Sequence, residues 1–360
     1  MGVTSANSTP LPAPDGLPLG GPAGLPEGWS STVPDLADVP RLAELRGRAA
    51  EPHTGSAAVD AAALAAEVAG PKSWTRRQLV VRDPAGAVRA WVRVHDRAAG
   101  RVVVDLDVDR TIPAAERVAA SCYAWAERVG RELAAQRGLT VTQLDAGTYA
   151  GDEAQRRWLA DAGYAHVRSW LQMSRPVSPE EAAPGALPGP RPGVTVRPVA
   201  THETDVPVAD DLQTVHRVLE SAFADHFNSY RESFPEFVQR LREDPGHRWD
   251  HWWLAFVDDP ENPGAPPVPA GALVGAVLPA GPDGKEGSYV EYLGATRVAR
   301  GRGVATALLL AVVQDAAARG RDRVGLEVDA DSPTGAHRLY ERWGWSTKYV
   351  TESWHKDVAV

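Results

Sequence analysis

Cysteine is almost absent from this 360-residue sequence, which contains only Cys122. A single cysteine excludes an intramolecular disulfide framework and disfavours a cysteine-built metal site, so we expect no metal. Long hydrophobic runs are missing too. No segment approaches the roughly 18 apolar residues that span a bilayer, and the N-terminus lacks the features of a secretory signal. The sequence therefore predicts a soluble, cytoplasmic protein that does not contact a membrane.

The chain also lacks a surplus of basic residues. It has 38 Lys and Arg against 47 Asp and Glu, a formal net charge of −9. A nucleic-acid partner would require a basic face, so none is expected. The acidic balance mildly favours neutral or cationic small partners, although such a balance commonly reflects solubility alone. The sequence indicates no particular oligomeric state.

Proline and glycine, by contrast, are plentiful and concentrated in two places. Residues 1–28 are rich in Pro, Gly and Ala with almost no charge, which predicts a disordered tail. Residues 176–193 form a second Pro-rich run, which predicts a semi-stiff linker. The linker separates residues 29–175 from residues 194–360, and each of these segments is long enough to be a domain.

The two segments repeat the same order of elements, which indicates an α+β class. In the first, strands within 77–109 precede a helix at 114–138 and a strand at 140–144. In the second, strands within 251–298 precede a helix beginning at Val304 and a strand at 323–331. The "RRWLADAGY" block ending at Tyr164 recurs as "HRLYERWGW", 181 residues later. We infer the duplication of one domain.

A glycine-bearing turn precedes the helix that begins at Val304. A helix N-terminus presents unpaired N–H groups and partial positive charge, so it binds anions where the chain can approach closely. Gly301 and Gly303 permit that approach, while Arg300 and Arg302 add cationic donors. The spacing fits neither the Walker nor the dinucleotide pattern. The turn predicts a pyrophosphate cradle, and the alternative is a turn that caps a buried helix beside solvated arginines.

From Ser288 to Trp345, the blocks "YVEYLGATRVA", "RGRGVA", "VGLEVDAD" and "GAHRLYERWGW" resemble the GNAT superfamily of acyl-CoA-dependent N-acyltransferases. The resemblance implies an α/β protein of two tandem GNAT folds, each a mixed, mostly antiparallel sheet flanked by helices, with acetyl-CoA as cosubstrate. The first half has no glycine between Arg101 and Val129, and Leu159 falls where the second half has Tyr340. We therefore expect a degenerate first copy without a coenzyme site.

The resemblance also assigns residues to the coenzyme. The amides around Arg302 to Thr306 hold the pyrophosphate, and Leu293 with Gly294 supplies a strand amide to the thioester carbonyl, where glycine would permit a bulge. Ser332 stands where the family usually has asparagine. The complete expected set is Leu293, Gly294, Arg300, Gly301, Arg302, Gly303, Val304, Ala305, Thr306 and Ser332.

Two residues are candidates for proton transfer. Tyr340 occupies the position of the hydroxyl that protonates the departing thiolate in the family, and the alternative is a tyrosine packed in a helix. Strand alternation places Glu291 with Tyr289 and Leu293, opposite Val290 and Tyr292. A carboxylate in an apolar strand is costly unless it is used or paired, so Glu291 is a candidate base or a salt-bridge residue.

These observations favour an acetyl-CoA-dependent N-acetyltransferase in which an amine of a small molecule attacks the thioester directly. Two alternatives remain open. One is an acyl-CoA-binding regulatory module without turnover, and the other is an acetyltransferase for a protein or peptide amine. The fold does not choose the acceptor.

Overall fold

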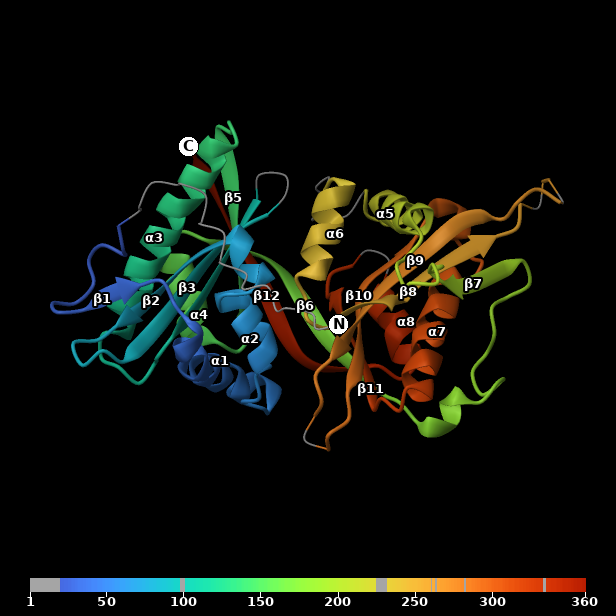
Figure 1. Ribbon diagram of the computed structural model, residues 1–360, viewed down its shortest axis with the longest axis horizontal. Coiled ribbons are helices and arrows are strands. Elements are labelled where there is room, and N and C mark those ends of the chain that lie inside the picture. The colour runs from blue at the N-terminus through green and yellow to red at the C-terminus, as the bar shows by residue number, and fades with distance from the viewer. Residues whose placement is uncertain are drawn as a thin grey trace, which may run out of the picture.

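One sheet of twelve strands runs through the described part of the chain, in the order β1-β2-β3-β4-β5-β12-β6-β11-β10-β9-β8-β7. Figure 1 shows this sheet crossing the whole computed structural model, with helices on both sides. The structure describes residues 20–97, 101–224, 232–259, 261–262, 264–281, 283–332 and 335–360. None of the helices in these ranges is long and apolar enough to cross a membrane.

The elements fall into an N-terminal half, up to residue 176, and a C-terminal half from residue 194. The N-terminal half contains β1 (Ser30–Thr32), α1 (Val39–Thr54), α2 (Ala61–Val68), β2 (Arg76–Arg82), β3 (Val88–Asp96), β4 (Arg101–Val108), α3 (Ala115–Gln136), β5 (Val141–Tyr149), α4 (Glu153–Asp161) and β6 (Ala165–Pro176). The C-terminal half contains β7 (Val194–Pro198), α5 (Ala209–Phe223), α6 (Phe234–Arg242), β8 (His247–Val257), β9 (Val268–Leu278), β10 (Gly287–Ala295), α7 (Val304–Ala318), β11 (Arg323–Asp329), α8 (Ala336–Arg342) and β12 (Ser346–Ala359).

Each half contains one strand–helix–strand crossover. In the N-terminal half β4 and β5 are parallel and α3 joins them, and in the C-terminal half β10 and β11 are parallel and α7 joins them. The other described pairings are antiparallel. This confirms the predicted fold class, a mixed and mostly antiparallel sheet flanked by helices.

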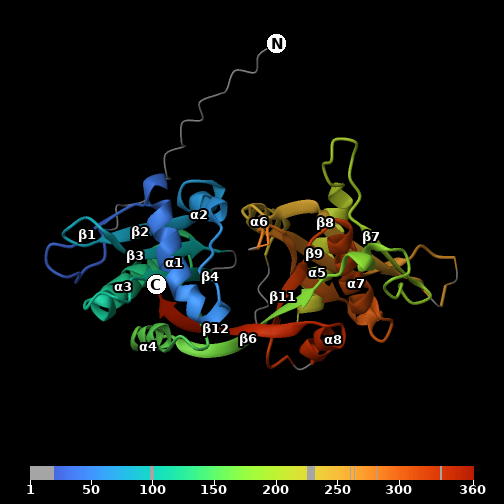
Figure 2. The same ribbon diagram turned by 90° about the horizontal axis from the view of Figure 1, so that it is seen from below.

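The two halves share this sheet because their last strands lie side by side at its centre. Strand β12, at the end of the chain, pairs with β5 of the N-terminal half, and β6 pairs with β11 of the C-terminal half. β12 and β6 also pair with each other. Figure 2 shows these two long strands passing from one half to the other. Backbone hydrogen bonds therefore join the halves directly.

The sheet has two faces, each covered by different helices. We call the face covered by α1 and α2 in the N-terminal half, and by α5 and α6 in the C-terminal half, the front face. The back face carries α3 and α7. Helix α7 is apolar nearly all round, and Leu308, Leu309, Val312 and Val313 are completely buried. Burial of these side chains fixes α7 against the sheet.

Glycine at position 271 of β9 lets the start of α7 approach the sheet closely. A Cβ atom at Gly271 would lie 2.4 Å from Cγ1 of Val304, the first residue of the helix. A larger side chain would push the helix N-terminus outward. The position of the predicted anion-binding turn therefore depends on packing against β9.

Two segments without regular structure pack more tightly than their composition predicts. Within the predicted tail, residues 1–19 lie outside the described residues, but Arg117 binds the carbonyls of Gly24 and Leu25 at 2.8 and 3.1 Å. The prediction of disorder is therefore wrong for residues 20–28. The Pro-rich linker contains a 3-10 turn, Pro179–Ala182, beside α7, and Leu187 packs against the C-terminal core. It follows the surface of this half instead of standing away from it.

Candidate active site

The glycine turn before α7 has the backbone that the sequence predicts. Gly301 and Gly303 have φ values of 73° and 79°, in the left-handed region that glycine adopts readily. Gly303 is the N-cap of α7, and within the described residues no side chain caps the helix. The amides at the start of α7, from Val304 to Thr306, therefore face the turn with the positive end of the helix dipole. This geometry suits an anion.

The arginines beside the turn are arranged differently from the prediction. Arg302 donates to the carbonyls of Asp258 at 2.8 Å and Gly193 at 3.4 Å, so it ties the turn to the ends of β8 and the linker. Arg300 is exposed. The linker contributes a third cation to the turn: Arg191 donates to the carbonyl of Gly301 at 2.8 Å. Sequence reasoning missed Arg191, since the Pro-rich run around it carries no sign of a long-range contact.

Close packing also favours glycine at position 303 of the turn. A Cβ atom at Gly303 would lie 3.1 Å from the side chain of Arg191, whereas one at Gly301 would meet nothing within 4 Å. Arg191 therefore covers one side of the turn at Gly303. The cation at this turn comes from a segment about a hundred residues away in the sequence.

Strand β10 contains a bulge at Glu291. The pairing with β9 slips between Val290 and Tyr292, so Glu291 has no partner residue in the ladder. The prediction of a bulge at Gly294 is wrong, because Gly294 stays in register with Ala272. A Cβ atom at Gly294 would lie 2.9 Å from Leu219 and from Ala222 of α5. The absence of a side chain at Gly294 therefore lets α5 pack closely against β10. A bulge leaves backbone groups of β10 unpaired at Glu291.

The bulge also shifts the faces of β10. Val290 and Leu293 both pack in the core beneath α7, on the back face. Tyr292 packs with Phe237 of α6 on the front face. The predicted alternation, which put Leu293 with Glu291 and Val290 with Tyr292, is therefore wrong after the bulge. One extra residue in the strand moves every later side chain to the opposite face.

Glu291 has an unusual electrostatic setting. Burial raises the pKa of its carboxyl to about 7; Asp244 adds to this effect, while Arg240 and Lys72 oppose it. Lys72 belongs to the N-terminal half, so both halves contribute to this environment. Among the described residues, Glu291 has no hydrogen-bonded partner. A carboxyl group that titrates near neutral pH suits a general base.

Tyr340 lies in helix α8, which packs against β11. Its side chain is 9% exposed and packs in the C-terminal core, with its ring centroid 6.3 Å from that of Trp345. Burial raises the pKa of the phenol to about 12, so it stays protonated at neutral pH. Within the described part of the chain its hydroxyl has no hydrogen-bond partner. A protonated phenol of this kind can act as an acid toward a thiolate.

Ser332 closes the turn before α8. Its amide donates to the carbonyl of Asp329 at 3.2 Å, and its carbonyl accepts from Gly335 at 2.9 Å. These backbone contacts fix the entry of α8 and so the position of Tyr340.

A second carboxylate, missed by sequence reasoning, lies beside Glu291. Glu327 is on β11, which pairs with β10 in the register Val290↔Leu326, so Glu327 follows directly on the neighbouring strand. Gln172 of β6 donates to its Oε2 at 2.6 Å, and burial raises its pKa. The signal that singled out Glu291, an acidic residue in an apolar strand, was also present in "RVGLEVD".

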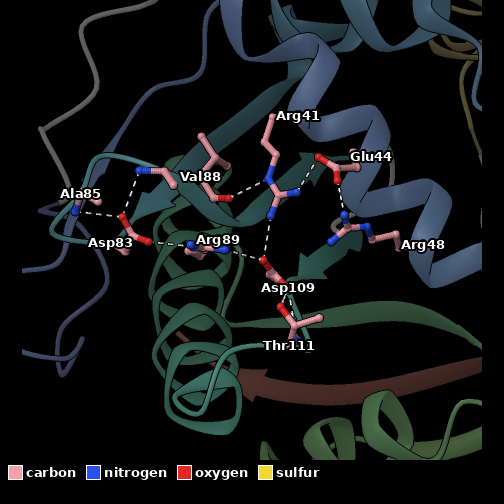
Figure 3. Close-up of polar contacts among 10 residues, drawn as sticks. Arg41, Glu44, Arg48, Asp83, Ala85, Val88, Arg89, Asp109 and Thr111 are labelled. Atoms are coloured by element: carbon pink, nitrogen blue, oxygen red, sulfur yellow. Dashed lines mark hydrogen bonds and ion pairs between the residues drawn. The ribbon is translucent and has the colours of Figure 1, made fainter.

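The corresponding connection in the N-terminal half is chemically different. It begins at Asp109, which is 3% exposed and directly follows β4. Figure 3 shows Asp109 accepting from Arg41 at 2.7 Å and from Arg89 at 2.8 Å. Thr111 donates to the other carboxylate oxygen through its amide and hydroxyl. A fixed carboxylate stands where the C-terminal half has a glycine turn.

The ionisation of Asp109 follows from these contacts. Burial opposes the charge, but hydrogen bonds from Thr111 and Arg89 and the charge of Arg41 prevail and lower the pKa to about 2. The carboxylate therefore stays negative at neutral pH, and Arg41 and Arg89 already form ion pairs with it. An incoming phosphate would meet repulsion at this connection.

The site described above lies in a segment that matches a known family. Residues 218–345, from the second half of α5 to just beyond α8, match the acetyltransferase (GNAT) family. The C-terminal half thus contains a domain of that family, which is a family of transferases. Among curated proteins, none matches the sequence significantly.

Solved structures extend the likeness to nearly the whole chain. A GCN5-related N-acetyltransferase from Sphaerobacter thermophilus matches 93% of this chain and 98% of its own, with a TM-score of 0.69 and 23% identity. A tandem GNAT protein from the clavulanic acid biosynthesis pathway matches 91% of this chain and 98% of its own, with a TM-score of 0.64 and 16% identity. At these identities the likeness concerns the fold, which is therefore a tandem GNAT architecture.

Proposed function

We propose that this protein is an acetyl-CoA-dependent N-acetyltransferase that acts on a primary amine of a small molecule in the cytoplasm. The observation that carries the proposal is the carboxyl of Glu291 at the β10 bulge, whose pKa burial raises to about 7. It lies on the strand that leads directly into the glycine turn and α7. Burying a carboxylate in an apolar strand costs free energy, and a carboxylate without a chemical role would gain nothing that offsets this cost.

The C-terminal half supplies the parts that such a transfer needs. We assign the pyrophosphate of the cosubstrate to the amides from Arg302 to Thr306, beside Gly301, Gly303 and the exposed Arg300. The described pairing of β10 with β11 ends at Val290, and the free edge of β10 beyond it, near Leu293 and Gly294, is assigned to the thioester carbonyl. These assignments rest on the open start of α7 and on the end of the pairing between β10 and β11.

The chemistry then needs two proton transfers. An amine attacks the acyl carbon, a C–N bond forms and the C–S bond breaks. Glu291, directly or through a water molecule, takes the proton that the amine loses. Tyr340 gives its proton to the sulfur that leaves. Both groups have pKa values that suit these directions near neutral pH, about 7 for the base and about 12 for the acid.

For the N-terminal half we propose a supporting role. Residues 29–175 form the degenerate copy, residues 176–193 the linker, and residues 194–360 the catalytic domain. The ion-paired Asp109 argues against a coenzyme phosphate in the degenerate copy. Lys72 brings a charge of this half to the environment of Glu291. Glu243, after α6, also accepts from Thr75 and Arg76, each at 3.2 Å, and holds the halves together on the front face.

The test is the release of free coenzyme A from acetyl-CoA in the presence of a panel of amines, with mass spectrometry of the products. We expect an acetylated amine product with wild-type protein and at least a tenfold slower reaction with Glu291→Gln. Tight binding of acetyl-CoA in calorimetry without any acetylated product would instead identify a regulatory acyl-CoA-binding module. Acetylation confined to peptide amines would overturn the small-molecule assignment.

A further inference from the structure

A row of polar side chains crosses the centre of the front face. Tyr149 of β5 stands opposite Thr351 of β12, and Gln172 of β6 donates to the hydroxyl of Thr351 at 2.9 Å. The same Nε2 atom of Gln172 donates to Glu327 of β11 at 2.6 Å. Glu291 follows on β10. The row therefore runs across the strands that the two halves share and ends at the candidate base.

At one end of this row α1 covers Tyr149, whose ring stacks on that of His53 with 4.7 Å between the centroids. Figure 2 shows α1 and α2 over one half and α6 over the other, with β12 and β6 between them. Thr351 and Gln172 are half-buried, and Glu327 is exposed to solvent. Beyond Tyr149 the row reaches a cavity of about 340 Å³, lined by charged residues of α1, α2, β3 and β4. Polar groups placed at the centre of a sheet indicate a surface that contacts water or a polar ligand.

Glu327 is the solvent-exposed carboxylate of this row. Gln172 gives it one hydrogen bond, and within the described residues no lysine, arginine or histidine forms an ion pair with it. Solvent reaches the side chain, although the surrounding protein removes enough water to raise the pKa of its carboxyl. A carboxylate in this setting has an electrostatic reason to bind a cation.

Aromatic rings complete the surroundings of Glu327. Burial and then the charge of Glu327 raise the pKa of Tyr289, and Glu291 adds to this rise. The pKa of Tyr349 is likewise raised by burial and by Glu327. The ring of Tyr349 in turn lies 5.7 Å from that of Tyr149. Phenol rings close to a carboxylate are suitable walls for an ammonium or guanidinium group.

We propose that the acceptor carries a second cationic group, an ammonium or a guanidinium, which Glu327 binds while the amine to be acetylated lies at Glu291. Gln172 positions the Glu327 carboxylate and connects it to Thr351. The proposal rests on the proposed function and names the substrate class, diamines and related dications. The two carboxylates on adjacent strands select acceptors by the spacing of their charges.

The experiment compares α,ω-diamines of increasing length with monoamines of the same length. Wild-type protein should show a KM minimum at one diamine length and weak use of every monoamine. Glu327→Gln should raise the KM for that diamine about 10- to 100-fold, with little change in kcat and none in the KM for monoamines. The exposed Glu203, changed to Gln, is the matched control and should leave every KM unchanged.

Two further variants distinguish a binding role from a structural one. Glu327→Lys should abolish the preference for diamines and favour amines that carry a carboxylate at the same spacing. Gln172→Ala should raise the KM for the diamine less than Glu327→Gln does, and Gln172→Asn should restore part of the loss. Equal binding of acetyl-CoA by all variants, measured by calorimetry, shows that the fold is intact.

Equal KM values for the diamine with wild type and Glu327→Gln would overturn the proposal, as would a wild-type protein that uses monoamines equally well. Failure of the proposed function looks different, because wild type would then acetylate no amine at all. In that case, calorimetric titration of the same diamines into wild type and Glu327→Gln still decides whether Glu327 binds a dication.

Discussion

Replacing Glu291 with glutamine should make the protein more stable at alkaline pH while lowering its activity at least tenfold. Burial raises the pKa of this carboxyl from 4.5 to about 7. The folded state therefore keeps its proton between these two pH values, where the unfolded chain has already lost it. Because the folded state binds more protons, the stability of the wild type falls as the pH rises through this range.

The size of the effect follows from the same two pKa values. Raising a carboxyl pKa from 4.5 to about 7 costs the folded protein about 3 kcal/mol once the pH exceeds 7. Glutamine has a similar shape and cannot ionise, so the variant avoids this cost. We expect Glu291→Gln to exceed the wild type in unfolding free energy by up to about 3 kcal/mol at about pH 8 and to differ little at about pH 4.5.

Urea unfolding at a series of pH values measures this difference. The first unfolding transition should be compared, because the two halves need not unfold together. Glu203→Gln, an exposed change, is the control for the loss of a charge. In the wild type kcat/KM should rise with pH to a plateau above about 7, and this dependence should vanish in the variant. Parallel stability profiles for wild type and Glu291→Gln would refute the raised pKa and with it the role of base.

Three changes test the rest of the site. Tyr340→Phe should lower kcat about 10- to 1,000-fold, with little change in the affinity for acetyl-CoA, and unchanged kcat with rate-limiting chemistry would remove Tyr340 from the mechanism. Gly303→Ala should weaken acetyl-CoA binding about tenfold or more in calorimetry, because φ is positive there and the new Cβ would press on Arg191. Arg191→Ala should weaken acetyl-CoA binding several-fold at low salt and less at high salt, and a salt-independent affinity would exclude an electrostatic role.

The sequence predicted the strands and helices that cover a core. Strands β2 to β5 and β8 to β11 carry apolar residues on one or both faces, and the sequence predicted strands in these regions. Strands β6 and β12 were missed because they lie at the centre of the sheet, between the helices of one half and those of the other. Many of their residues are only half-buried, so these strands carry little of the apolar alternation that marks a strand. Helix α1 was also missed, since Gly47 and Pro52 interrupt its pattern.

The candidate site divides in the same way. The glycine turn, Glu291 and Tyr340 lie in short sequence blocks whose residue types and spacing can be recognised from the sequence alone. Arg191 and Lys72 reach the site only through long-range packing, which no local pattern encodes. Glu327 carried the same local signal as Glu291, an acidic residue in an apolar strand. The bulge was misplaced because glycine at 294 serves the packing of α5, while the slip at Glu291 depends on the pairing with β9.

The shared sheet explains why the N-terminal half remains even if it binds no coenzyme. Without β6 the parallel strand β11 would have an unpaired edge, and Glu327 would lose Gln172. Without η2, the 3-10 turn Pro71–Thr75, the environment of Glu291 would lose Lys72, whose charge opposes the rise in pKa. The C-terminal half thus depends on its neighbour for a strand, a hydrogen bond and a charge, and the proposed acceptor surface lies where the two halves meet.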